Sequence, residues 1–212
     1  IVTVITVALS GWHYYTAGFG LHNEIAHRAI HLAVVLGLCF LVFPRQRRLP
    51  GPWEWIVSIG LVVFYGLLGW GLLRDLGSDV PPPAQAAFMA VLLAVAGLSL
   101  PLRAYDGSHR HIPWRDWIFA ATASGFSLYL LLLFDSIFIQ RPGQHTPADL
   151  MVGVIAIVMV IEATRRTMGI FLPLLAIATV LYGIYGPYLP GGLAHRGYSV
   201  SRVIAHLYKG TE

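Results

Sequence analysis

One group of polar side chains in the sequence has the spacing of a metal site. Glu24, His27 and His31 are separated by three and four residues, which places them on one face of a helix. Di-iron helix bundles use a Glu-x-x-His pair, but they take a second pair from another helix, and no second Glu-x-x-His occurs here. Arg28, beside the pair, would repel a cation. We therefore interpret these residues as a polar turn at a membrane boundary, with a metal site as the alternative.

A second charged group has the spacing of a self-neutralising cluster. Glu162 precedes Arg165 and Arg166 by three and four residues, so the carboxylate can pair with both guanidinium groups on one helix face.

Asp135 is the acid most embedded in an apolar run, and intramembrane carboxylates are usually functional. Because polar residues such as Arg141 follow it closely, we interpret Asp135 as a boundary residue.

The sequence offers no basis for predicting an enzyme. It contains no Walker motif, no G-x-S-x-G, no C-x-x-C and no H-E-x-x-H. The serines in its apolar runs have no base partner nearby, and the one cysteine excludes an intrachain disulfide. We expect neither a catalytic residue nor a protein-bound metal in this chain.

The composition identifies the environment in which these groups must work. The chain of 212 residues is 57% hydrophobic and 11% charged, whereas soluble domains have about 45–50% apolar and about 25% charged residues. A soluble fold is excluded because so few charges could not cover a water-exposed surface. The net charge is +4, but the basic residues stand between apolar runs, where they determine topology, so we predict no nucleic-acid partner.

Apolar runs of about 20 residues each can cross a bilayer, and proline and glycine clusters separate them. The predicted fold is therefore an all-α, polytopic membrane helix bundle surrounded by lipid. The segments, about seven in number, are roughly 1–17, 26–43, 54–73, 84–102, 117–139, 149–164 and 169–189.

The sixth segment is the least regular of these. Its uninterrupted apolar part, 150–161, makes only about 18 Å of helix. It spans the bilayer only if Glu162, Arg165 and Arg166 lie at the boundary, with the arginine side chains reaching toward water. A re-entrant or interfacial helix is the alternative.

The distribution of arginine predicts the orientation. The loops after the second, fourth and sixth segments contain eight: Arg45, Arg47, Arg48, Arg103, Arg110, Arg115, Arg165 and Arg166. The alternate loops contain four: Arg28, Arg74, Arg141 and Arg196. Because cytoplasmic loops are richer in basic residues, we predict a cytoplasmic N-terminus, with the stretch from 190 onward beginning outside.

Aromatic and small residues support these boundaries and predict contacts. Tyr182, Tyr185 and Tyr188 close the seventh segment, as expected of rings that prefer the headgroup level. Small residues let membrane helices approach closely. They predict helix contacts at two stripes: Ala33 with Gly37, and Ala86 with Ala90 and Ala94.

Two blocks of sequence resemble a known family. The first is HYYTAGFGL from His13, followed by HRAIHL from His27; the second is EATRRTMG from Glu162, followed by LPLLAIATVLYGIYGPYLPGGLAHRGYS from Leu172. Together they resemble the tripartite ATP-independent periplasmic (TRAP) transporters, specifically the fused 4TM/12TM permease of the TAXI subgroup. The EATRR and GPYLPG…AHRGYS block is the specific part of this resemblance, which also covers IPWRDW and TPADL.

The resemblance implies a domain organisation. Residues 1–166 would form the small scaffold membrane domain and 167–212 the start of the large transport domain. The stretch 53–102 would be a two-helix insertion, because the small domain of the family usually has four spans. The family continues beyond the position of Glu212 into a Gly-rich re-entrant hairpin, so we expect this chain to be an N-terminal fragment, with the substrate and sodium sites beyond it.

The resemblance also implies a function: sodium-driven uptake of organic acids across the bacterial inner membrane, with substrate delivered by a periplasmic solute-binding protein. Transporter sites are built from broken helices, and no segment within 1–165 has paired central breaks. We therefore expect this part of the chain to be mainly scaffold, with the binding protein docking on 16–25, 74–83 or 190–200. The alternatives are a non-transporting membrane anchor or assembly subunit, and a membrane enzyme with a metal centre at Glu24, His27 and His31.

Overall fold

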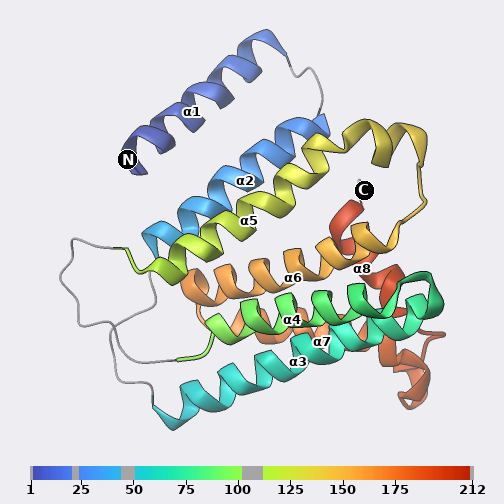
Figure 1. Cartoon of the computed structure of the whole chain (residues 1–212). Helices are drawn as coiled ribbons and strands as arrows, with labels where there is room; N and C mark the ends of the chain where they lie inside the picture. The colour runs from blue at the N-terminus through green and yellow to red at the C-terminus, as the bar shows by residue number, and fades with distance from the viewer. Residues whose placement is uncertain (1, 21–23, 44–50, 102–111, 211–212) are drawn as a thin grey trace. The chain divides into compact units, whose positions relative to one another are not determined.

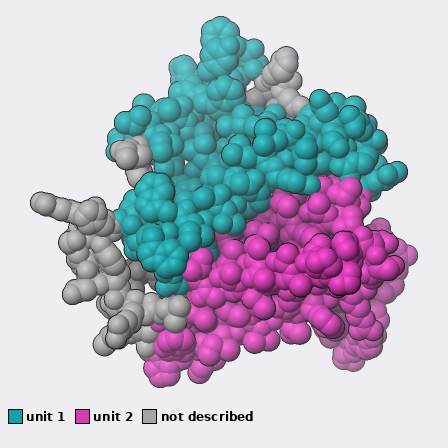
Figure 2. All heavy atoms as spheres, in the orientation of Figure 1, with its two compact units in different colours: residues 1–45, 107–144, 211 teal, residues 46–106, 145–210, 212 magenta. Residues whose placement is uncertain are grey.

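The computed structural model describes residues 2–20, 24–43, 51–101 and 112–210, and every regular element among them is helical. This confirms the predicted all-α helix bundle. The helices group into two compact units (Figure 2), with the described parts of 1–45 and 107–144 in unit 1 and those of 46–106 and 145–210 in unit 2.

The helices follow the predicted segments closely (Figure 1). Unit 1 contains α1 (Val2–Phe19), α2 (Glu24–Val42), α5 (Trp114–Leu132) and the π-helix η2 (Asp135–Gln140). Unit 2 contains α3 (Pro52–Leu76), η1 (Gly77–Asp79), α4 (Pro82–Leu98), α6 (Pro147–Met168), α7 (Phe171–Tyr185), η3 (Gly186–Tyr188), η4 (Gly191–Leu193) and α8 (Val200–Lys209). The fifth predicted segment differs most, because its α-helix stops at Leu132 and the chain continues as η2.

Local sequence explains where several helices begin and end. Pro52, Pro82 and Pro147 each occupy the first turn of a helix, where the missing N–H costs nothing and the fixed φ already suits the helix. Thr146 and Asp149 add a capping box to α6, which satisfies two backbone N–H groups. Gly169 ends α6 at φ +82°, a conformation that strongly favours glycine.

Four helical stretches in the described parts of the chain are long and apolar enough to cross a membrane: Glu24–Val42, Pro52–Asp79, Pro147–Met168 and Phe171–Tyr188. The third of them is the sixth predicted segment, so by length and composition it qualifies as a full span. α4 is apolar but has 17 residues. α1 and α5 are outside this set. That α1, α4 and α5 also span the bilayer stays a prediction.

The core of unit 1 lies between α2 and α5. The rings of Phe40 and Phe119 stack with their centroids 5.2 Å apart, and both side chains are fully buried. Ala33 and Gly37 of α2 are buried where Ser124 of α5 approaches them. The predicted contact through this small-residue stripe is confirmed.

The core of unit 2 forms where α3 packs against α4, α6 and α8. The predicted contact through Ala86, Ala90 and Ala94 is wrong, because all three residues are exposed. The buried face of α4 is the other one: Phe88, Leu92, Val95 and Ala96. A helix that is apolar on every side does not reveal from sequence which face packs, and here the larger side chains form the core.

The two units do not follow the order of the sequence. Unit 1 joins α1 and α2 to α5, while the predicted insertion, 53–102, contributes α3 and α4 to unit 2 together with α6, α7 and α8. Position 166 lies within α6, and both α6 and α7 belong to unit 2. The boundary at 166 between a scaffold and a transport domain stays a prediction.

Candidate functional site

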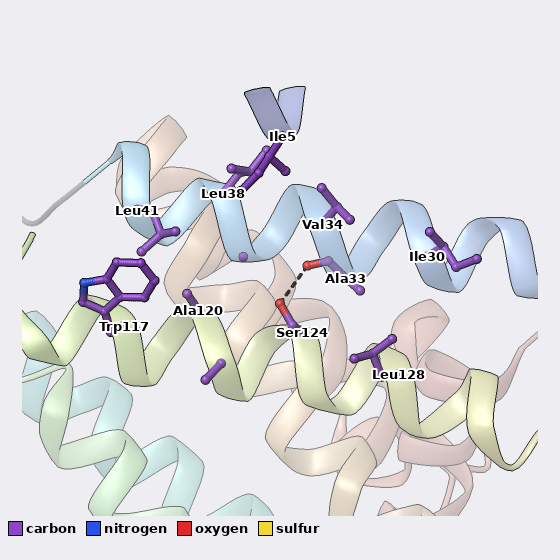
Figure 3. A pocket seen from close by; sticks show the side chains of 12 residues that line it. Ile5, Ile30, Ala33, Val34, Leu38, Leu41, Trp117, Ala120, Ser124 and Leu128 are labelled. Atoms are coloured by element: carbon purple, nitrogen blue, oxygen red, sulfur yellow. Dashed lines mark hydrogen bonds between the residues drawn. The ribbon is translucent and has the colours of Figure 1, made fainter. Parts of the chain in front are cut away.

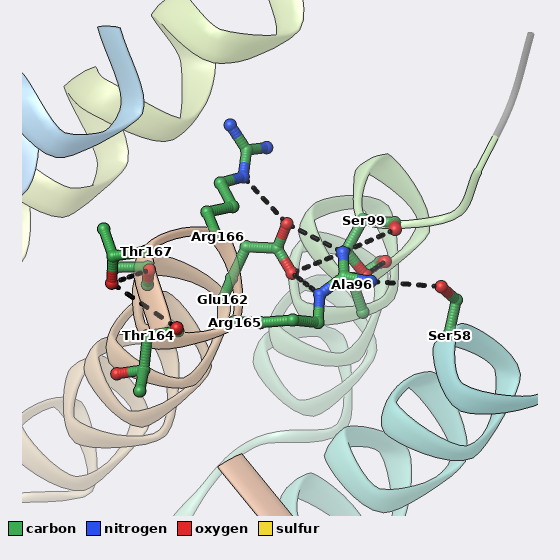
Figure 4. A network of polar contacts seen from close by, with 9 residues as sticks. Ser58, Ala96, Ser99, Glu162, Thr164, Arg165, Arg166 and Thr167 are labelled. Atoms are coloured by element: carbon green, nitrogen blue, oxygen red, sulfur yellow. Dashed lines mark hydrogen bonds and ion pairs between the residues drawn. The ribbon is translucent and has the colours of Figure 1, made fainter. Parts of the chain in front are cut away.

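The candidate site is the charged cluster in the last turns of α6 (Figure 4). The Glu162 side chain is fully buried, and it lies between two guanidinium groups. Arg165 donates from Nε to one carboxylate oxygen and from Nη2 to the other, both at 2.9 Å. Arg166 donates from Nε at 3.0 Å. The predicted neutralisation on one helix face is confirmed, and it takes a forked geometry that only arginine can provide.

Arg165 also connects α6 to two neighbouring helices. Its Nη1 donates to the hydroxyl of Ser58 on α3 at 3.3 Å, and its Nη2 donates to the carbonyl of Ser99 after α4 at 3.2 Å. Both serines are buried. We expected this side chain to extend toward water at the boundary. It instead turns into unit 2, and its exposed fraction is only 13%.

The chemistry open to this cluster follows from its pairing. Three charge-assisted hydrogen bonds occupy the Glu162 carboxylate, so little of it is left to bind a cation or a substrate proton. Arg165 has bonds to Glu162, Ser58 and Ser99 at once. A buried cluster of this kind specifies how helices pack, and removing one member leaves the others without their partners. The arrangement is therefore that of a structural cross-link between α3, α4 and α6.

The remaining predicted boundary residues, Arg45, Arg47 and Arg48, lie outside the described residues. The predicted orientation of the chain depends on them and stays a prediction. Asp135 is described and exposed at the first position of η2, next to Ser136, whose hydroxyl accepts a 3.0 Å bond from Arg141.

The histidines of the alternative metal site bond to a third histidine in the structure. Glu24 pairs with Arg28. His27 and His31 both bond to His13 of α1, through N···N distances of 3.1 and 2.6 Å. The two contacts use opposite ring nitrogens of His13, so the three rings form a chain instead of converging on one point. In the described part of the chain, no group of three or more possible ligands could hold a metal ion.

A second charged pair, missed by the sequence analysis, lies at the other end of α6. Lys209 of α8 donates to Asp149 at 3.2 Å, and the Asp149 side chain is fully buried. Burial and then the charge of Lys209 lower the pKa of nearby His145 below its usual 6.5, while Asp149 opposes this shift. The capping-box pattern from Thr146 to Asp149 was the available signal, but it could not identify Lys209, 60 residues away in the sequence.

Unit 1 contains an apolar cavity of about 450 Å³ between α2 and α5 (Figure 3). Trp117 and Leu41 line one end and Leu128 the other, and Ile5 of α1 also contributes. Ser124 provides the hydroxyl in this lining, and it already donates to the Ala33 carbonyl at 2.9 Å. None of the described residues that line the cavity is charged, so this lining offers no group that would recognise an organic anion.

Comparisons of the chain with protein-family models, with curated proteins and with solved structures find no match. The functional hypothesis therefore depends on the sequence blocks and on the geometry described above.

Proposed function

We propose that this chain is the N-terminal part of the membrane permease of a sodium-driven TRAP transporter of the TAXI type, located in the bacterial inner membrane with a cytoplasmic N-terminus. In this proposal a periplasmic solute-binding protein delivers an organic acid, and the remainder of the large membrane domain holds the acid and the sodium ions. The residues described here act mainly as scaffold.

The observation that carries the scaffold role is the cross-link through Arg165. It joins three helices of unit 2 through Glu162, Ser58 and Ser99, and it lies in the EATRR block that carries the resemblance. A transport site for an anion needs cationic or backbone N–H groups facing a cavity. The one cavity described above is apolar. Paired charges and an apolar cavity both favour a supporting role.

Reconstitution tests the transport function. The product of the complete reading frame is placed in proteoliposomes with an inward sodium gradient, and radiolabelled mono- and dicarboxylic acids are supplied with the solute-binding protein. We expect accumulation that requires both sodium and the binding protein. Accumulation that is independent of sodium would overturn the proposed mechanism, and no accumulation with any acid would favour a non-transporting anchor.

A protein limited to residues 1–212 tests the scaffold role separately. It should insert into membranes and give no sodium-dependent uptake, because the proposal places the ion and substrate sites elsewhere. Sodium-dependent uptake by this shorter protein would overturn the scaffold role and leave the transporter assignment intact.

A further inference from the structure

α8 is a ten-residue amphipathic helix that fits against glycines on its neighbours. Three helices of unit 2 each present a glycine to an apolar side chain of α8: Gly71 of α3 to Val200, Gly153 of α6 to Ile204, and Gly183 of α7 to Val203. A Cβ at Gly153 would lie 2.8 Å from Ile204 Cγ2. Ile204 is fully buried. One face of α8 is thus fixed in unit 2, and the opposite face is free for another partner.

Both ends of α8 are attached to carboxylates at the ends of longer helices. The Ser201 N–H donates to Asp75 at the end of α3 at 3.0 Å. Lys209 donates to Asp149 at the start of α6 at 3.2 Å. α3 and α6 both qualify as membrane spans, and spans end at the membrane boundary. α8 therefore lies at that boundary.

Exposed tyrosines locate this boundary independently. Tyr182, Tyr185 and Tyr188 at the end of α7 are all exposed, and so is Tyr198 just before α8. Tyrosine is enriched at the level of the lipid headgroups, where its ring is apolar and its hydroxyl is hydrated. This end of unit 2 thus has the composition of a membrane interface.

The free face of α8 is basic with an apolar edge. Arg202 is exposed, with its guanidinium carbon 5.4 Å from the centre of the Tyr198 ring. Arg196 is exposed in the irregular segment before α8, and Leu207 of α8 is 54% exposed. Neither Arg196 nor Arg202 forms an ion pair with another described residue. Basic side chains beside apolar ones are typical of helices that lie in the lipid interface.

We propose that Arg202, on the free face of α8, and Arg196, in the segment just before this helix, bind the phosphate headgroup of an anionic phospholipid. The guanidinium fork matches two phosphate oxygens, and Leu207 and the tyrosines contact the adjoining acyl region. An acidic protein would satisfy the two arginines equally well, but the exposed tyrosines and leucine favour lipid. This inference does not depend on the transport function.

Native mass spectrometry of the full chain, purified in detergent and stripped of lipid, tests the proposal with phosphatidylglycerol and phosphatidylcholine as probes. The wild type should bind phosphatidylglycerol more tightly. In Arg196→Gln/Arg202→Gln we expect its affinity to fall about 25-fold, about fivefold for each cation lost near an anionic headgroup. Arg196→Lys/Arg202→Lys keeps the two charges and removes the forked geometry, so it should lose less affinity than the glutamine variant and more than none. Arg28→Gln, which removes one positive charge from α2, is the control and should change the affinity less than twofold.

Cross-linking with a photoreactive phosphatidylglycerol is the second measurement. It identifies the residues at which the lipid binds, so lipid bound at other sites does not affect the result. We expect cross-links within 196–207 in the wild type and their loss in the double glutamine variant. Unchanged affinity in that variant, or cross-links only elsewhere, would overturn the proposal. If the variant instead keeps its lipid affinity and loses capture of an acidic protein, the face docks a protein and the lipid assignment is wrong.

Discussion

Replacing Glu162 by glutamine tests whether the cluster on α6 stabilises unit 2. The substitution preserves the shape of the side chain and removes its charge. Two guanidinium groups then lose the carboxylate that accepts three of their hydrogen bonds. Arg165 retains its bonds to neutral groups on Ser58 and Ser99.

The expected magnitude follows from burial. Removing one partner of a buried ion pair costs about 3–5 kcal/mol, and we expect the low end because the glutamine carbonyl still accepts one bond. For a chain of this size, each kcal/mol corresponds to about 2–4 °C in Tm. Glu162→Gln should therefore lower Tm by roughly 6–12 °C.

The chain contains a matched control for this experiment. Glu24 and Arg28 form an ion pair with the same four-residue separation as Glu162 and Arg166, but their side chains are 65% and 62% exposed. Exposed pairs contribute about 0–1 kcal/mol, so Glu24→Gln should lower Tm by less than about 4 °C. Thermal unfolding of both variants in one detergent, followed by tryptophan fluorescence, gives the comparison.

A double-mutant cycle separates the ion pair from general disruption. Arg165→Gln alone should cost less than Glu162→Gln, because Arg166 still neutralises the carboxylate. The double variant should be more stable than the sum of the two losses predicts, by about 0.5–3 kcal/mol. The reasoning fails if the two losses simply add, or if Glu162→Gln is no more destabilising than Glu24→Gln.

Three further predictions concern the start of α6 and the core of unit 1. Gly153→Ala should destabilise the protein by about 1–3 kcal/mol, because the new methyl group meets Ile204; faster proteolysis after 199 would show that α8 has detached. The pKa of His145 is lowered by burial and by Lys209, so the unfolded state binds more protons between that lowered pKa and 6.5. The free energy of unfolding should rise with pH through this window and level off above it, and His145→Gln should abolish the slope in denaturant titrations. Ser124→Ala removes the side-chain bond between α5 and α2 and should cost about 0.5–1.5 kcal/mol in the same titrations.

Sequence patterns located the helices, four of which in the described parts of the chain qualify as membrane spans, because hydropathy and proline positions are local properties. They also gave the Glu162–Arg165 pair, since its three-residue spacing fixes the geometry on a helix. They could not provide Ser58, which is 107 residues from Arg165 and reaches it only through helix packing. His13 was missed for the same reason, because it meets His31 only when α1 packs against α2.

α8 was missed because it is too short and too polar for a membrane-segment search. Its apolar positions, Val200, Val203, Ile204 and Leu207, do follow the helical period. Ser199 at its N-cap accepts a bond from the Arg202 N–H at 3.3 Å, which is a recognisable start signal. The helical pattern was therefore present in the sequence. Nothing in the local sequence indicated which glycines of other helices the apolar side chains of α8 would contact.

The charged groups at the two ends of α6 bear on the proposed scaffold role. Glu162 is neutralised within its own helix, whereas Asp149 is neutralised by Lys209 of α8. Both carboxylates are fully buried, and each is also bound to a neighbouring element, directly or through its partner. An ion-coupled step requires a charge that can exchange partners as the cargo moves. The charges at both ends of α6 are each held by several bonds, and this opposes an exchange of partners. The bonding therefore supports the proposal that the transport site lies outside this helix.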